Sequence, residues 1–195
     1  MYRLEGGQSD EVWLTVGEKT RLYISESHCH IDVCSSNGSE PLIENWTLGD
    51  SSVARIARPK DSILLAKRMV IYGDRRMELT GRRIGTTTLN ARAPDSTIVR
   101  ARVHVTRPLR RIRVEPRPTT MRANQLINFI ARVSDVDGKA VNGVPFMLWV
   151  LRDTTRMWGS VTAKPVPVQF DSAGRYRVIV AFKNLADTLS VVVRP

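Results

Sequence analysis

The chain has 195 residues, of which 42% are hydrophobic, and a formal net charge of +11. This composition is typical of a globular protein and excludes a disordered one. No run of about 18 apolar residues predicts a membrane-spanning helix. The charge is uneven, because residues 1–54 carry a net −6, residues 55–113 a net +12 and residues 114–195 a net +5. Arg outnumbers Lys by 24 to 6, and guanidinium groups pair well with carboxylates and phosphates, so the basic segment predicts an acidic partner.

The first expected strands are Glu11–Val16 and Thr20–Ser25, with a turn at Gly17–Lys19 between them. The following segment, His28–Cys34, contains His, Cys and Asp, which are metal-ligand residue types. Its spacing matches no standard zinc pattern, so the residues favour two alternatives over a metal site. One is a disulfide between Cys29 and Cys34, which would indicate an oxidising compartment. The other is a pair of buried free thiols. No metal or other cofactor is predicted.

The stretch 97–106 alternates between apolar and polar residues, which is typical of a strand with one buried face. Residues 87–93 alternate in the same way, and Pro94–Ser96 between them has turn chemistry, so the two stretches predict a hairpin. By parity, Arg92, Arg100 and Arg102 share its exposed face, where His104 is expected as a solvated side chain.

Thr106–Leu109 predicts a domain boundary, because a strand ends there and Pro108 cannot continue a ladder. We therefore expect two domains, residues 1–107 and 108–195. The second contains further expected strands at 111–114, 127–133, 144–151, 175–182 and 188–193. Many short strands separated by regular turns predict an all-β protein of two tandem immunoglobulin-like β-sandwich domains.

Paired arginines recur near turns and near the boundary. They are either a docking surface for an acidic partner or a solvated face. Anionic lipid is a further candidate partner, whereas nucleic acid is disfavoured because no recognised binding fold or aromatic stacking ladder accompanies the charge. The candidate docking residues are Arg75, Arg76, Arg82, Arg83, Arg92, Arg100, Arg102, Arg110, Arg111 and Arg113.

The segment 152–159 is expected to be a loop, on which Met157 and Trp158 either form an interface anchor or fold back on the core. Asp135 and Asp137 flank a turn, where capping is favoured over acid–base chemistry and over calcium binding, since the remaining ligands of a calcium loop are missing. No nucleophile elbow or other catalytic constellation is found. We therefore predict that the protein is not an enzyme.

Three blocks of the first half are Val16–Leu22, Trp46 with Asp50–Ile56, and Gly81–Leu89. In order and rough spacing they resemble the bacterial immunoglobulin-like domain, group 2, over residues 11–106, with longer insertions at 26–42 and 58–78. Residues 110–195 resemble the invasin-type group 1 domain more weakly, through Ala131–Phe146 and Asp171–Val178. The resemblance implies exported, non-catalytic modules of surface, periplasmic or virion proteins, and it names no ligand.

Together these features predict a structural or binding protein. Its expected role is a membrane-extrinsic subunit that clamps or bridges components of a larger assembly through Arg-rich surfaces. A photosynthetic reaction-centre and antenna complex is one such setting, and a fragment of a bacterial surface adhesin or of a phage virion decoration protein is the alternative. We expect an extracytoplasmic location, periplasmic or at the cell surface, although the first residues lack the pattern of a signal peptide.

Overall fold

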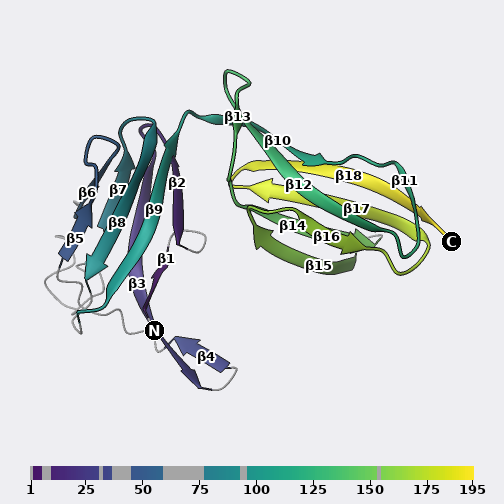
Figure 1. Ribbon diagram of the computed structural model, residues 1–195, viewed down its shortest axis with the longest axis horizontal. Coiled ribbons are helices and arrows are strands. Elements are labelled where there is room, and N and C mark those ends of the chain that lie inside the picture. Colours follow the sequence, from purple (N-terminus) through teal and green to yellow (C-terminus); the bar gives the residue numbers. More distant parts are fainter. Residues whose placement is uncertain are drawn as a thin grey trace, which may run out of the picture. The chain divides into compact units, whose positions relative to one another are not determined.

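The computed structural model describes residues 2–5, 10–30, 33–36, 45–58, 77–92, 96–152 and 155–195. The chain divides into two compact units, Met1–Arg107 (unit 1) and Pro108–Pro195 (unit 2), and the described residues of each form β-strands (Figure 1). None of the described residues belongs to a helix that is long and apolar enough to cross a bilayer. The predicted fold class, two tandem immunoglobulin-like β-sandwiches, is confirmed.

Unit 1 contains two sheets that enclose one core. In order across the first sheet, the strands are β1 (Tyr2–Glu5), β3 (Lys19–His30), β7 (Met77–Gly81) and β6 (Ala54–Ala57), with β4 (Val33–Ser36) paired to β3. In order across the second, they are β2 (Glu11–Thr15), β9 (Ile98–Thr106), β8 (Gly85–Arg92) and β5 (Asn45–Leu48). The chain thus changes sheets between β1 and β2, and β2 pairs in parallel with the last strand, β9. Antiparallel pairs make up the rest of both sheets.

The predicted alternation of β8 and β9 is confirmed by burial. Leu89, Val103 and Val105 are fully buried between the sheets, whereas Arg100 and Arg102 are exposed. Burial of one apolar row per strand supplies most of the driving force that holds such a sandwich together. The core of unit 1 consists of Val12, Leu14, Leu22, Val53, Ala54, Leu79, Leu89, Ala91, Ala101, Val103 and Val105.

The turn between β2 and β3 joins the two sheets of unit 1 at one end. Gly17 adopts a φ of 84°, which favours glycine, and its N–H donates to the Gly81 carbonyl at 2.9 Å. Gly81 N–H donates in turn to the Glu18 carbonyl at 3.0 Å. A Cβ at position 81 would lie 2.6 Å from the Thr15 carbonyl oxygen, so the close approach of β7 to β2 requires glycine there.

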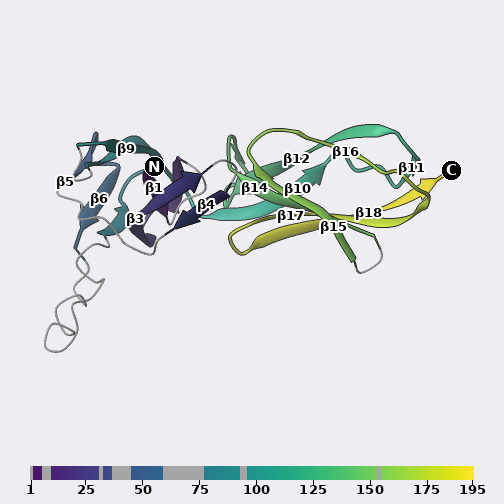
Figure 2. The ribbon, with the colours of Figure 1, turned by 90° about the horizontal axis from the view of Figure 1, so that it is seen from below.

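Unit 2 is a second sandwich with the same change of sheets after its first strand, and its two layers are visible in Figure 2. Its first sheet contains β10 (Leu109–Glu115), β12 (Leu126–Asp135) and β13 (Ala140–Val141), with β16 (Val166–Gln169) paired to β12. Its second contains, in order, β11 (Thr120–Arg122), β18 (Leu185–Arg194), β17 (Gly174–Phe182), β14 (Phe146–Arg152) and β15 (Thr155–Thr162). β11 pairs in parallel with the last strand, β18.

Among the described residues, the core of unit 2 has more aromatic side chains than that of unit 1. Phe129, Phe146 and Phe170 are fully buried, and Tyr176 packs on Phe170 with ring centroids 4.7 Å apart. The hydroxyl of Tyr176 donates to the Ser172 carbonyl at 3.0 Å. A buried tyrosine needs such a partner for its polar end, and this one closes the turn before β17.

The expectation of a loop at 152–159 is wrong. Residues from Thr155 onward form β15, an edge strand paired with β14. A register shift between Val150 and Leu151 sets Val150 opposite Trp158 and Leu151 opposite Arg156. The polar run before Trp158 has the composition of a loop, but pairing with β14 satisfies its backbone hydrogen bonds and overrides that local preference.

Candidate functional site

The outer face of the sheet β2-β9-β8-β5 in unit 1 is the most distinctive charged surface that the structure describes. β9 contributes Arg100 and Arg102, and β8 contributes Arg92. Antiparallel register sets Asn90 opposite Arg100, so Arg92 is the diagonal neighbour of Arg100. All three side chains are exposed, and no ion pair joins them to a residue within the described ranges. We call this surface the arginine face.

An aromatic stack lies beside these arginines. Parallel pairing sets Trp13 of β2 opposite His104 of β9, and the two rings stack with centroids 4.1 Å apart at an interplanar angle of 13°. Glu11 Oε2 accepts a hydrogen bond from Trp13 Nε1 at 3.3 Å. Glu11 Oε1 lies 3.8 Å from His104 Nε2, beyond hydrogen-bond distance. On the opposite side of the imidazole, Thr86 Oγ1 lies 3.3 Å from His104 Nδ1.

The stack changes the chemistry of His104. Its side chain is 17% exposed, so the expectation of a solvated histidine is wrong, because Trp13 covers one side of the ring. Burial lowers the pKa of His104 below its ordinary value of 6.5; Glu11 opposes this shift and the charge of Arg102 adds to it. The imidazole is therefore neutral at pH 7. A neutral ring stacked on Trp13 provides a mostly apolar platform next to exposed guanidinium groups.

Sequence reasoning did not find Trp13, Glu11 or Thr86 as members of this face. The alternation in Glu11–Thr15 places Glu11 and Trp13 on the same side of β2. The parallel pairing of β2 with β9, which sets Trp13 opposite His104, is a long-range contact that no local sequence pattern predicts.

Arg82 and Arg83 contact a turn of their own unit. Their backbone N–H groups both donate to the Val53 carbonyl, at 2.8 and 3.1 Å. Arg83 Nη2 donates to Ser52 Oγ at 2.9 Å and lies 3.9 Å from Asp50 Oδ2. Hydrogen bonds from the side chain and backbone of Ser52 lower the pKa of the Asp50 carboxyl. These contacts hold the 50–53 turn, so this pair stabilises unit 1 locally.

Arg110, Arg111 and Arg113 lie on β10 of unit 2, where all three are exposed. Register sets Arg113 opposite Arg132, whose Nε donates to Glu115 Oε2 at 3.3 Å. They therefore belong to a different sheet and a different unit from the arginine face.

The remaining candidates lie wholly or partly outside the described residues. Arg75 and Arg76 are among the residues that the structure does not describe. The hairpin of β3 and β4 sets Cys29 opposite Cys34, but the description does not extend to their side chains, so the disulfide stays a prediction. The same holds for the side chains of Met157 and Trp158, which lie on β15.

Asp135 acts as a turn residue. Its buried carboxylate accepts hydrogen bonds from the backbone N–H groups of Asp137 at 3.0 Å and Lys139 at 2.8 Å. Those bonds stabilise the β12–β13 turn. The part of the chain that the structure describes has no group of three or more His, Cys, Asp and Glu residues that could hold a metal ion.

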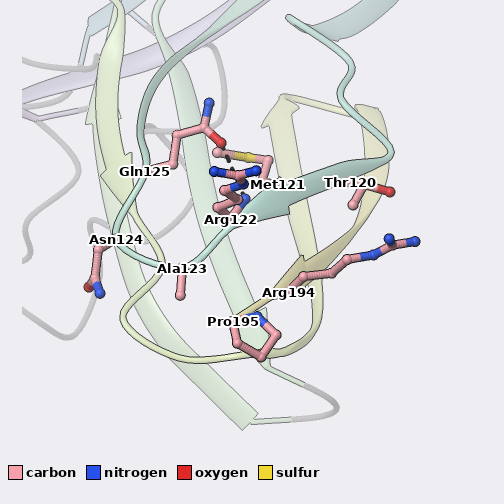
Figure 3. Close-up of a pocket in the computed structure, with 8 residues that line it drawn as sticks. All are labelled: Thr120, Met121, Arg122, Ala123, Asn124, Gln125, Arg194 and Pro195. Carbon is pink, nitrogen blue, oxygen red and sulfur yellow. Dashed lines mark hydrogen bonds between the residues drawn. The ribbon is translucent and has the colours of Figure 1, made fainter.

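An open depression of about 780 Å³ lies in unit 2 where β11 and β18 end (Figure 3). Arg122 and Arg194, which are opposite each other across the parallel pair β11–β18, are its charged lining residues. Arg122 N–H donates to Gln125 Oε1 at 3.2 Å, which closes the turn on one side of the depression. The lining contains no His, Cys, Asp or Glu, which are the usual residue types for general acid–base catalysis.

No protein-family model and no curated protein matches this chain. Among solved structures, the chain is similar over its whole length to the fibronectin(III)-like modules of CbhA from Clostridium thermocellum, with 13% identity, 94% of that chain covered and a TM-score of 0.33. It is also similar over its whole length to domains 5–6 of the S-layer protein SbsC, with 10% identity, 98% of that chain covered and a TM-score of 0.37. The CD2-binding domain of CD58 matches 95% of this chain and 97% of its own, with 9% identity and a TM-score of 0.37. At these scores the likenesses assign neither family nor function, and the group 2 resemblance stays a prediction.

Proposed function

We propose that this chain is a non-catalytic, immunoglobulin-like binding protein that holds an acidic partner protein against the arginine face of unit 1. The observation that carries the proposal is the exposure of Arg92, Arg100 and Arg102 on one sheet face without ion-pair partners among the described residues. Exposed cations without ion-pair partners steer acidic partners and set their orientation.

The Trp13–His104 stack supports a protein partner over a diffuse ionic contact. Specific interfaces combine a rigid aromatic anchor with charged residues around it. The two stacked rings are held by Glu11 and Thr86, so they lose little side-chain entropy on binding. In its narrower form, the proposal is that the chain belongs to the bacterial immunoglobulin-like group 2 modules and works outside the cytoplasm. There it would clamp or bridge components of a membrane complex as an extrinsic subunit.

The test is crosslinking with mass spectrometry on native material, followed by charge reversal. We expect crosslinks from the arginine face to an acidic protein surface, and we expect the Arg100→Glu and Arg102→Glu double variant to weaken that complex by about 100-fold, because two attractive contacts become repulsive. Arg55→Glu is the control matched to the single variant Arg100→Glu, because Arg55 is exposed on the other sheet of unit 1 and the two variants make the same charge change.

Equal weakening by Arg55→Glu would show that only net charge matters and would refute a specific face. Crosslinks only to a glycan-bearing receptor would favour the adhesin alternative. Binding to anionic vesicles that the double variant abolishes, without any protein crosslink, would replace the protein partner with lipid.

A further inference from the structure

The second sheet of unit 2 has an outer face on which apolar residues are in register. Antiparallel pairing aligns Val161, Met147 and Ala181 in one row across β15, β14 and β17. The next row aligns Gly159, Trp149 and Ile179. These side chains are half-buried or exposed, and Val161 is 54% exposed. We define the apolar face by Met147, Trp149, Val161, Ile179 and Ala181.

Strand β14 has the residue pattern of a strand covered on both sides. Its residues Phe146–Leu151 are all apolar, although the sandwich core covers only the side of Phe146, Leu148 and Val150. A sheet with one solvated face alternates apolar with polar residues, and a continuous apolar run is typical of strands buried on both faces. The outward residues Met147 and Trp149 therefore match a surface that a partner covers.

The same face becomes cationic towards its other end. β17 presents Arg175 outward, opposite Val192 of β18, and Arg194 and Arg122 follow at the ends of β18 and β11. These last two line the depression shown in Figure 3. At the outward positions of the five strands, as far as the structure describes them, no Asp or Glu is found. Asp187 of β18 faces the other sheet, where it accepts from Val114 N–H at 2.9 Å.

We propose that this outer face is a second docking surface, which binds an acidic segment of another protein. The apolar side chains of that segment cover the rows of Met147 and Ile179, and its carboxylates meet Arg175 and Arg194. A second copy of this chain fits less well. Two identical faces would either place Arg175 and Arg194 against the same arginines of the other copy or leave these cationic ends without an acidic partner. The inference concerns unit 2 alone and does not depend on the arginine face of unit 1.

The test uses the full chain and a defined probe, a short dye-labelled synthetic peptide that alternates Glu with Leu and Ile. Binding is measured by fluorescence anisotropy against two comparison peptides, one with Lys in place of Glu and one with Ser in place of Leu and Ile. We expect the acidic, apolar peptide to bind at least about tenfold more tightly than either, since both the charge and the apolar side chains contribute.

Two variants at exposed positions locate the peptide on the face without disturbing the core. We expect Arg175→Glu and Val161→Glu each to weaken binding by about tenfold, because each places a carboxylate against an acidic probe. Arg113→Glu is the control, since Arg113 is exposed on the other sheet of unit 2 and carries the same charge change as Arg175→Glu. The Arg100→Glu and Arg102→Glu double variant, which tests the arginine face, is expected to leave peptide binding within about twofold.

Three results would overturn the inference. One is failure of the acidic, apolar peptide to bind more tightly than its comparison peptides. Another is equal weakening by Arg113→Glu, which would reduce the effect to net charge. The third is concentration-dependent dimerisation of the full chain that Val161→Glu abolishes, because that result would assign the face to a second copy.

Discussion

The two units have the same architecture, but the outer surfaces of the sheets compared below differ in chemical character. In each, the chain changes sheets after its first strand, and the next strand pairs in parallel with the last. The outward positions of the sheet that contains this parallel pair differ: in unit 1 they include Thr88, Asn90 and Arg100, and in unit 2 Met147, Trp149 and Ile179. The inward rows of both are mainly apolar, with Val and Leu in each, joined by Ala in unit 1 and by aromatic residues in unit 2. The inner rows therefore determine the fold, and the outer rows are free to specialise for partners.

The sharpest test of this division compares neighbouring residues of β14. Leu148 is fully buried and Met147, next to it, faces outward. We expect Leu148→Ala to lower the free energy of unfolding of unit 2 by about 3 kcal/mol, through lost burial and a residual cavity. Met147→Ser should cost no more than about 0.5 kcal/mol, as is usual for surface substitutions. Urea denaturation followed by residue-resolved hydrogen exchange measures both, and equal costs would show that the outer row belongs to the core.

A second difference between the units is the half-buried carboxylate of Asp187 in unit 2. Burial raises the pKa of its carboxyl, but hydrogen bonds from Val114 N–H and Arg117, together with the charge of Arg117, outweigh that effect and lower it below 3.8. We expect Asp187→Asn to destabilise unit 2 by about 1–2 kcal/mol at pH 7, because a hydrogen-bonded charge is lost.

The pH dependence of that effect has a definite sign. Since the folded-state pKa of Asp187 is depressed, the unfolded chain binds more protons at acid pH, and the stabilisation is complete above about pH 5 and is lost as the pH falls through 3.8 and below. Denaturation at several pH values measures it. A difference between the original chain and Asp187→Asn that stays constant down to pH 2 would contradict this explanation.

Unit 1 has its own pH-dependent group in His104. Burial depresses the pKa of His104 below 6.5, so at acid pH the unfolded chain takes up a proton more readily than the folded chain. The contribution of the neutral imidazole to the stability of unit 1 is therefore complete above pH 6.5 and falls as the pH decreases below that value. We expect Trp13→Leu to raise the pKa of His104 towards 6.5, since a leucine side chain covers less of the imidazole than the stacked indole ring does. NMR titration of the imidazole measures this shift, and an unchanged pKa would mean that Trp13 is not the cause of burial.

The smallest expected effect distinguishes Arg83, which contacts the 50–53 turn, from the arginine face. Arg83→Ala should lower the stability of unit 1 by no more than about 0.5 kcal/mol, because its contacts to Ser52 and Asp50 are exposed. It should leave partner binding unchanged, unlike Arg100→Glu. A binding assay beside thermal denaturation measures both, and loss of binding by Arg83→Ala would extend the site to this turn.

The fold could be predicted well from the sequence, whereas the candidate site could be predicted only in part. Period-two alternation in residues 97–106 follows from the geometry of one strand, so Arg100 and Arg102 could be placed on one face before any tertiary structure was known. The stack of Trp13 on His104 could not, because β2 and β9 meet across about 90 residues of sequence and neither strand contains a signal for the other. For the same reason the hydrogen bonds of Arg82 and Arg83 to the 50–53 turn could not be predicted, since that turn is distant in sequence; a docking role for these two arginines stays a prediction.

By itself, the sequence determined which residues of β8 and β9 lie inward and outward, that a turn separates β2 from β3, and that the charge is concentrated in its middle third. These are local properties, set by alternation, turn chemistry and composition. Only the tertiary structure decided which strands are neighbours. It therefore also decided that Trp13 buries His104, that 155–162 is a strand, and that Val161, Met147 and Ala181 are in register. Side chains on different strands become one surface only through hydrogen-bonded register, which is a property of strand pairs.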